Sequence, residues 1–421
     1  RGSLFGDDRT LRFKGADSRS QGEDANLRLI HHGHWEVDAL AYLQARNFSN
    51  KVISATSFKL TLDQRNTPST GIGGKLELRP PVGPDHVLRL GADVRFAHGQ
   101  LYEDAYAATG LVTTRRTAGG NESTTGLFLE DDWTLGKLVL TGGARLDRWA
   151  ITDGFFLERT AAGVPLSDRM FPRRDGTKAT ARAGALFPIT PTVALRAAAY
   201  TGYRLPTLNE LYRPFVVFPI TTQANENLGL EKLRGFEVGT DIKPVEGVSL
   251  GLTAFYNRLG DAIANVTIGP NLRQRQNVTA IVAKGVEATF HARRGAASLA
   301  ASYAYSDSNV AARVLALDGL IPAQSPRHTA SATIAYGRSG TPTLSATMRY
   351  VGRQYEDDLE TDVLPAATTV DLVAALPLRR GFSFVVRAEN LFDVEVLTRN
   401  QAGSIDLGTP RTLWIGVRVG R

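Results

Sequence analysis

Apolar and polar residues alternate along much of this chain. In the stretch that begins at Leu88, apolar residues occupy every second position as far as Phe96, and Arg89, Asp93 and Arg95 lie between them. A period of two places one kind of side chain on each face of a β-strand. The same alternation recurs in segments of about 9–13 residues, close to the length that crosses a bilayer at a tilt. The pattern predicts an all-β fold with about 19 strands.

The connections between the predicted strands alternate in length from residue 121 onward. Short turns carry Gly or Pro, as tight turns prefer, and fall near residues 134–136, 188–191, 244–247, 293–295, 337–341 and 377–381. Long polar connections fall near residues 151–178, 204–231, 259–279, 308–326, 355–364 and 393–409. An outer-membrane barrel sorts its connections in this way, with short periplasmic turns and long outer loops. We therefore predict a transmembrane antiparallel β-barrel whose first strand, near residues 8–14, runs toward the periplasm.

Composition agrees with this fold and excludes several others. The 421 residues include no cysteine, which rules out thiolate zinc sites and disulfides. No apolar run approaches the roughly 20 residues that a membrane-spanning helix needs. Lys and Arg number 49 against 42 Asp and Glu, so the formal net charge is +7. The basic pairs fall in loops and turns without interleaved aromatics, which gives nucleic-acid binding no support and instead suits an anionic lipopolysaccharide surface or an anionic chelate.

Several blocks of residues resemble the TonB-dependent outer-membrane receptor family. One block joins Tyr203 and Arg204 to Pro206 and then to Glu-Leu-Tyr at residues 210–212, and another reads Glu-Asn-Leu-Phe-Asp at residues 389–393. The blocks fall in the family's order at residues 127–133, 140–147, 203–212, 225–231, 236–239, 389–393 and 410–412. The resemblance covers roughly residues 121–421 block by block, and the earlier strands agree in pattern only.

The resemblance implies energised import across the outer membrane of a Gram-negative bacterium, without covalent chemistry and without a cofactor or resident metal. The implied cargo is a scarce, large nutrient, with a ferric siderophore first and cobalamin or haem as further choices. A plug domain closes the family's barrel, and the TonB–ExbB–ExbD complex of the inner membrane moves it. The family's barrel has roughly 22 strands. Residues 1–421 are therefore expected to form a partial barrel domain that lacks the plug and about three first strands.

The ligand site is expected in the long connection at residues 204–227, which mixes aromatic and polar side chains. The candidate ligand-binding residues are Arg204, Arg213, Phe215, Phe218, Gln223 and Asn225, with Tyr102 and Tyr106 in the loop after Phe96 as second choices. The block at residues 204–212 also has a structural interpretation, which we favour for it. In that interpretation Pro206 ends a strand, and residues 208–212 form one helical turn at the rim of the barrel.

Other chemistry has less support in the sequence. His31, His32 and His34 lack the carboxylate or cysteine spacing that would complete a metal site. The acidic runs at residues 130–132 and 356–358 lack the full calcium-loop pattern and suit the ends of solvated strands. The rival function is a passive porin, followed by a barrel enzyme and by a soluble β-sandwich lectin. A plug and TonB box upstream would favour the receptor over the porin, and solubility without detergent would exclude every membrane barrel.

Overall fold

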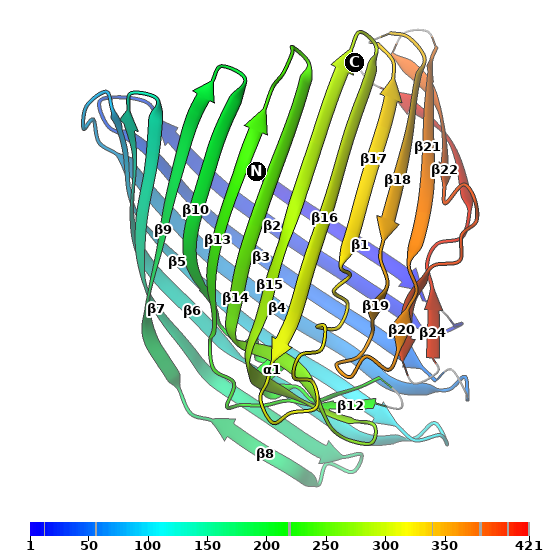
Figure 1. The fold of residues 1–421 in the computed structure, drawn as a ribbon. Helices are drawn as coiled ribbons and strands as arrows, with labels where there is room; N and C mark the ends of the chain where they lie inside the picture. The colour runs from blue at the N-terminus through cyan, green and yellow to red at the C-terminus, as the bar shows by residue number, and fades with distance from the viewer. Residues whose placement is uncertain are drawn as a thin grey trace.

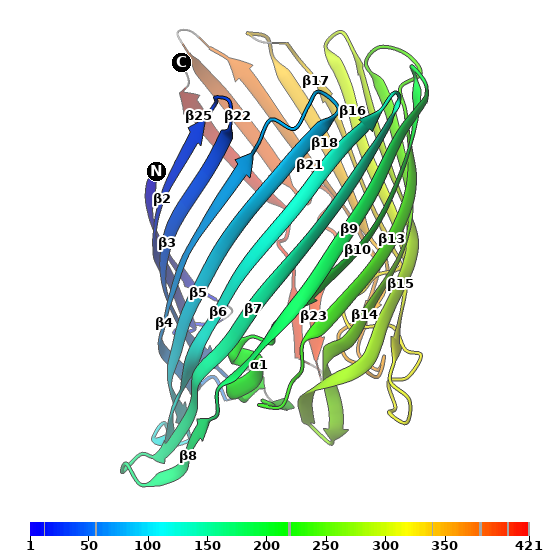
Figure 2. The same ribbon diagram turned by 90° about the vertical axis from the view of Figure 1, so that its left-hand side faces the viewer.

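The structure, a computed structural model, describes residues 1–11, 13–54, 57–217, 220–338, 340–378, 381–401 and 404–419. In these residues one sheet of 21 strands curls round into a barrel (Figure 1 and Figure 2). Successive strands of the wall are antiparallel neighbours, as in the pairs β2–β3 and β14–β15. The predicted antiparallel β-barrel is confirmed.

The strands of the wall are β1 (Gly2–Thr10), β2 (Asp17–His31), β3 (Glu36–Ile53), β4 (Leu60–Arg79), β5 (His86–Tyr106), β6 (Val112–Leu135), β7 (Leu138–Thr160), β9 (Arg174–Thr190), β10 (Val193–Arg204), β13 (Glu231–Ile242), β14 (Val248–Gly269), β15 (Leu272–Arg294), β16 (Ala297–Ala311), β17 (His328–Tyr336), β18 (Thr343–Val351), β21 (Ala367–Pro377), β22 (Phe382–Glu389) and β25 (Thr412–Val419). The connections add β8 (Pro165–Phe171), α1 (Leu208–Tyr212), β11 (Phe215–Val217), β12 (Ile220–Gln223), β19 (Gln354–Tyr355), β20 (Val363–Leu364), β23 (Leu397–Gln401) and β24 (Ser404–Leu407).

The alternation in the sequence separates the two faces of the wall. On β25, Leu413 is 68% exposed and Ile415 is 74% exposed. On β18, Met348 is exposed, whereas its neighbour Arg349 forms an ion pair with Asp371 of β21. The apolar face of an outer-membrane barrel points outward to lipid, so these exposed side chains are in a favourable medium. Among the described residues, no helix is long and apolar enough to cross a bilayer.

The two ends of the barrel differ as the connection lengths predict. At one end the turns are short, and Gly136, Gly247 and Gly295 take φ values of +61°, +78° and +61°. Glycine adopts this left-handed backbone without a steric penalty. At the opposite end the connections carry α1 and the small hairpins β11–β12, β19–β20 and β23–β24 (Figure 1). Short turns of such barrels face the periplasm, so we call the first end the periplasmic end and the second the outer end.

Two expectations about the strands are wrong in detail. Residues 151–178 and 259–279 were expected as loops, yet β7 continues to Thr160, and β14 pairs with β15 as far as its hairpin at Gly269. Outside the bilayer neither face of a strand meets lipid, so the alternation fades although the backbone ladder continues. The first strand, β1, runs toward the outer end and not toward the periplasm, because it is antiparallel to β2. The partial-barrel assignment stays a prediction.

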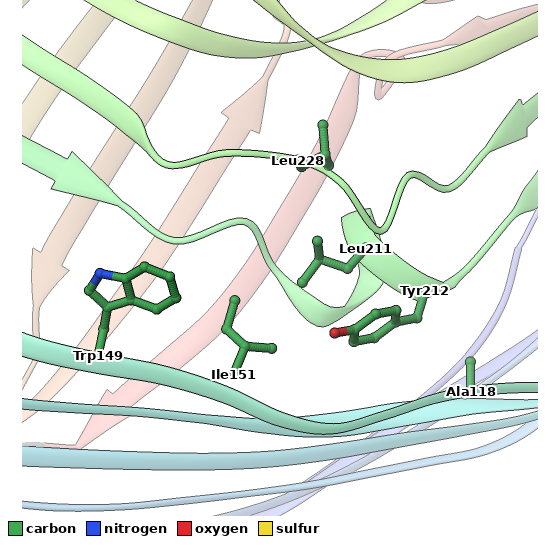
Figure 3. Close-up of a cluster of buried hydrophobic side chains, with 6 residues drawn as sticks. All are labelled: Ala118, Trp149, Ile151, Leu211, Tyr212 and Leu228. Atoms are coloured by element: carbon green, nitrogen blue, oxygen red, sulfur yellow. The ribbon is translucent and has the colours of Figure 1, made fainter. Parts of the chain in front are cut away.

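Buried apolar side chains gather in two clusters at the outer end. In the first cluster, α1 packs against the inner face of β6 and β7, where Trp149 and Ile151 lie (Figure 3). In the second, Leu317 from the connection after β16 packs against Ala262 and Val266 of β14. The wall of a barrel buries its apolar side chains in lipid. A protein core is therefore needed only where the connections fold against the wall.

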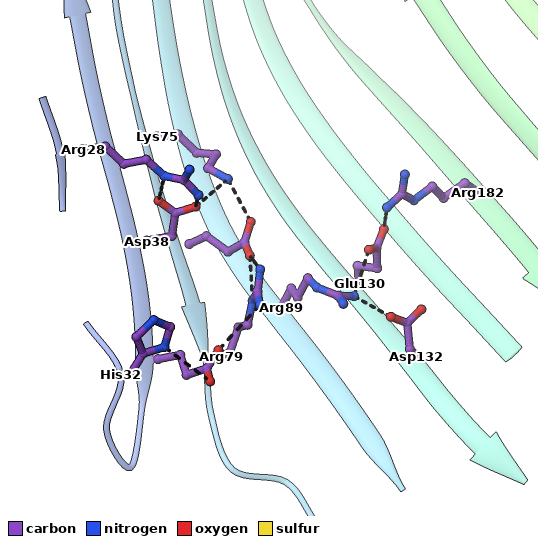
Figure 4. A network of polar contacts seen from close by, with 11 residues as sticks. Arg28, His32, Asp38, Lys75, Arg79, Arg89, Glu130, Asp132 and Arg182 are labelled. Atoms are coloured by element: carbon purple, nitrogen blue, oxygen red, sulfur yellow. Dashed lines mark hydrogen bonds and ion pairs between the residues drawn. The ribbon is translucent and has the colours of Figure 1, made fainter. Parts of the chain in front are cut away.

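Charged side chains on the inner face of β2 to β9 pair with one another (Figure 4). Arg28 donates two hydrogen bonds of 2.8 Å to the carboxylate of Asp38 on the neighbouring strand. Glu130 on β6 bridges Arg89 on β5 and Arg182 on β9. Glu130 and Asp132 therefore belong to an ion-pair network of the wall, and Asp131, on the opposite face of β6, pairs with His86. The run lies near a strand end as expected, but its carboxylates are paired and half-buried and not freely solvated.

Candidate functional site

The connection between β10 and β13 folds inward and carries the only α-helix of the described residues, α1. Thr207 caps this helix, since its hydroxyl accepts a hydrogen bond of 3.2 Å from the amide of Glu210. The Glu210 carboxylate accepts one of 2.7 Å from the amide of Thr207 in return. This reciprocal capping box satisfies two amides that the first turn would leave free. The helical turn expected at residues 208–212 is confirmed.

The helix is held against the inner wall by apolar packing. Leu211 and Tyr212 are buried against Ile151 of β7, and Leu228 closes the cluster from the far side of the same connection (Figure 3). Gly154 of β7 lies directly under the Tyr212 ring, where an added Cβ would be inside van der Waals contact. The wall therefore approaches the helix too closely for any other residue at position 154 unless the ring shifts.

Arg204, the first predicted ligand residue, joins the two ends of this connection. Its guanidinium donates to the Glu210 carboxylate at 2.9 and 3.1 Å and also to Glu231, the first residue of β13. Burial tends to raise the pKa of Glu210, but Arg204 and the Thr207 amide outweigh it and hold that pKa below its ordinary value. Arg204 is thus engaged in a structural ion pair, in agreement with the favoured interpretation of its block.

Arg213 attaches the connection to one side of the barrel. It donates 3.0 Å to the carboxylate of Glu103 on β5 and 3.2 Å to the side-chain oxygen of Gln64 on β4. Glu103 is only 1% exposed and also lies 3.5 Å from Arg116 of β6. A buried carboxylate needs such partners because desolvation of an unpaired charge is costly.

Arg275 of β15 attaches the same connection to another side of the barrel. Its guanidinium donates to the backbone oxygens of Asn209 at 2.6 Å and Arg213 at 3.0 Å, and it lies 4.9 Å from the centre of the Phe215 ring. Asn225 donates 2.9 Å to the backbone oxygen of Arg275 in return. Several strands separate β15 from β5 in the sheet. The connection is therefore a strap across the lumen, and we call its described residues, 204–217 and 220–230, the lumen strap.

The structure brings some of the predicted site residues together and leaves others apart. Arg204, Arg213, Phe215 and Asn225 all lie in the lumen strap, and Gln223 of β12 pairs in parallel with Gln274 of β15. Phe218 lies outside the described residues.

The second-choice residues on β5 do not join the strap. Tyr102 donates a hydrogen bond of 2.6 Å to Gln100 of its own strand. It points to the face opposite Glu103, because successive residues of a strand face opposite sides. Tyr106 lies near the carboxylates of Asp63 and Asp104.

Sequence reasoning missed Arg275 and Glu103. Both lie in polar stretches near strand ends, where Arg275 has Arg273, Gln274 and Gln276 around it. Nothing in the sequence distinguishes it from these neighbours. As for metals, the part of the chain that the structure describes holds no group of three His, Cys, Asp or Glu side chains placed to bind an ion.

The barrel, its sorted connections and the inward strap define a class of outer-membrane receptor barrel. Residues 1–391 match the protein family described as TonB dependent receptor-like, beta-barrel. Because this match covers most of the chain, the protein belongs to that family, which resides in the outer membrane of Gram-negative bacteria. The resemblance read from the sequence blocks is confirmed.

Individual relatives agree with this assignment. The metal-pseudopaline receptor CntO of Pseudomonas aeruginosa is 27% identical over 243 residues, which are 56% of this chain and 32% of that protein. The ferric yersiniabactin uptake receptor FyuA of Yersinia pestis has a TM-score of 0.79 and 17% identity, over 96% of this chain and 62% of that one. The siderophore receptor PiuA of Acinetobacter baumannii has a TM-score of 0.73 and 16% identity, over 96% of this chain and 64% of that one.

The chain is shorter than these relatives. It spans about a third of the length of the curated relative and less than two thirds of each of the two solved structures. The structural similarities, at 16–17% identity, establish the fold.

Proposed function

We propose that this chain forms the barrel of an energised importer of a metal chelate, with a ferric siderophore as the first cargo to test. Family membership supports import through a TonB-dependent receptor. The names of three relatives specify metal-pseudopaline, ferric yersiniabactin and a siderophore. None of these three names specifies cobalamin or haem, the other cargoes that the sequence leaves open.

The observation that carries the proposal is the lumen strap. It carries a cation, an aromatic ring and two amides inside the outer end of the barrel, in the residues Arg213, Phe215, Gln223 and Asn225, and these would meet a cargo that enters there. A metal chelate offers anionic oxygens to a guanidinium and flat apolar surface to a ring. The Nε of Arg213 is buried and, within the described residues, has no hydrogen-bond partner. A cargo bound at the strap would offer this donor an acceptor.

The cycle that follows from this proposal is binding and conformational change. The strap holds the cargo at the outer end, a plug domain closes the lumen, and TonB, with ExbB and ExbD, supplies the force that opens it. The chain's own residues do no covalent chemistry in this scheme, and the family consists of receptors and transporters. Lipopolysaccharide would surround the outer end, where Arg115 and Arg173 are exposed.

Uptake by whole cells tests this function. Deleting the gene should abolish accumulation of radiolabelled iron from one ferric siderophore among a panel, and a protonophore should abolish it equally in wild-type cells. The control is uptake of a small sugar, which should be unaffected by the deletion. Accumulation that survives the protonophore but is lost on deletion would overturn energised import and point to passive diffusion through a porin.

A further inference from the structure

The periplasmic end carries a group of basic side chains that have no acidic partners. Lys243 lies in the β13–β14 turn, Arg293 and Arg294 end β15, and Arg338 lies in the β17–β18 turn. We call these four residues the basic turn patch. All four are exposed, and within the described residues none of them forms an ion pair. The arginines Arg28 and Arg89 of the inner wall, by contrast, are paired with carboxylates.

The turns that hold these residues form one continuous surface. The amide of Arg293 donates 2.8 Å to the oxygen of Gly247, which joins the second turn to the first. The amide of Gly337 donates 2.9 Å to the oxygen of Ala296, which joins the third turn to the second. The three turns accordingly lie side by side at the top of Figure 1. The basic turn patch is thus a local cluster of charge and not a set of scattered residues.

This cluster has a net positive charge that the protein does not neutralise. Glu246 is the single acidic residue in the sequence of the three turns, at residues 243–247, 293–297 and 337–342. Val245 and Tyr336, beside the patch, are each 63% exposed. Apolar side chains exposed at the end of a barrel wall mark the boundary between acyl chains and headgroups. The basic side chains therefore stand at the depth of the periplasmic headgroups, where Arg294 shares the lipid-facing side of β15 with the exposed Val286 and Arg293 lies on the inner side.

An apolar groove on the outward face begins at the β17–β18 turn, which holds Arg338. It has a volume of about 430 Å³ and is lined by Tyr336, Leu344, Ala374, Leu376, Phe384 and Val386. Cross-strand pairing places Tyr336 opposite Leu344, and Leu376 opposite Phe384, so these side chains share the lipid-facing side of β17, β18, β21 and β22. Pro342 also lines the groove and ends the turn to which Arg338 belongs. The groove and the charge thus meet at one turn.

We propose that the basic turn patch and this groove together bind an anionic glycerophospholipid of the periplasmic leaflet. The phosphate would lie among the basic side chains, and one acyl chain would lie in the groove. Basic clusters next to a membrane span bind anionic headgroups in this way. Lipopolysaccharide is not the occupant, because it belongs to the opposite leaflet. A zwitterionic phospholipid lacks the net charge to compensate the patch. This site is independent of the imported cargo.

Lipid titration of the purified full chain in a non-ionic detergent tests the site. Bound lipid would be counted by native mass spectrometry, with phosphatidylglycerol and phosphatidylcholine of the same acyl chains as probes. The wild type should prefer phosphatidylglycerol. In the variant K243Q/R293Q/R294Q/R338Q, the ratio of phosphatidylglycerol affinity to phosphatidylcholine affinity should fall by at least about tenfold. Each basic residue near a membrane surface changes the affinity for anionic lipid by about fivefold.

A matched control removes four exposed arginines at the outer end, in the variant R115Q/R173Q/R313Q/R353Q, and should keep the preference. Loss of preference in both variants would mean that total charge alone is responsible, and retention in the first variant would mean that the patch binds no lipid. Either result overturns the proposal.

A second variant tests the groove without changing the charge. Ala374→Trp fills it, so binding of long-chain phosphatidylglycerol should weaken while binding of dihexanoyl phosphatidylglycerol stays unchanged. Equal binding of the long-chain lipid by Ala374→Trp and the wild type would exclude the groove. The Ala374→Trp experiment remains informative if the variant with four substitutions fails to fold.

Discussion

Arg213 of the lumen strap and the buried Glu103 of β5 form an ion pair of 3.0 Å, although 110 residues separate them in the sequence. Arg275 holds the same strap from β15 through the backbone oxygen of Arg213 at 3.0 Å. Two sides of the barrel are therefore linked across the lumen by one short segment. The strap can stay in place only while both attachments hold, and this dependence makes its energetics testable.

Removal of one partner of the buried pair should loosen the strap. Arg213→Met leaves the Glu103 carboxylate with Arg116 alone, and we expect the strap to lose about 2–4 kcal/mol of local stability. The double variant R213M/E103Q should recover part of this loss, because the buried carboxylate that lost its closer partner is removed as well. Hydrogen exchange of the strap amides measures both values in a double-mutant cycle. Equal exchange in all four proteins would mean that the pair does not hold the strap.

Acid should release the α1 end of the strap through Glu210. The pKa of Glu210 is lowered from its ordinary value of 4.5, so its ion pair with Arg204 stabilises the folded strap fully above that value. This contribution is lost as the pH falls through the lower, folded pKa. Glu231 and Glu122 also face the pair.

The quantity to measure is therefore the difference in the rate of strap proteolysis between the wild type and Glu210→Gln. Limited proteolysis of the strap from pH 7 to pH 3 should distinguish the two proteins at neutral pH and bring them together in acid. A gap between them that stays constant over this range would refute the role of Glu210.

Because α1 packs closely on β7, we expect substitutions of two glycines on this strand to differ in their effect on stability. Gly154→Ala places a methyl group against the Tyr212 ring, whereas Gly142→Ala on the same strand meets no atom within 4 Å. We expect Gly154→Ala to destabilise the packing of α1 by about 1–3 kcal/mol and Gly142→Ala to have little effect. Hydrogen exchange of the strap amides reports on both. Similar behaviour of the two variants would show that the helix does not lie on β7 as described.

The sequence was a good guide to the barrel wall and a poor one to the strap. Leu413 and Ile415 could be assigned to the lipid-facing side because a bilayer imposes a period of two on each strand. The capped turn at residues 207–212 could be predicted because its signals are local. Contacts such as Arg275 with the oxygen of Arg213 depend on which strands face each other across the lumen, and no local pattern encodes that.

The sequence did not predict the extended hairpin of β14 and β15, and the reason is related. Residues 259–279 mix apolar and polar side chains without a regular period of two, and Ala262 and Val266 pack against a folded connection, so the sequence pattern is that of a loop while the backbone forms a continuous ladder. The ladder is fixed by the strands below it in the bilayer. Periodicity therefore locates the membrane part of a strand but not its outer end.

The most direct test of the account is the uptake affinity of strap variants for the ferric siderophore that depends on this gene. Arg213→Ala combined with Phe215→Ala should raise the half-saturating concentration by about tenfold or more, because a charged hydrogen bond and a ring contact are both lost. Arg349→Ala, which breaks an ion pair of the wall outside the strap, serves as the control and should leave uptake unchanged. An unchanged half-saturating concentration in the strap variant, at equal barrel levels, would contradict a ligand-binding role for the lumen strap.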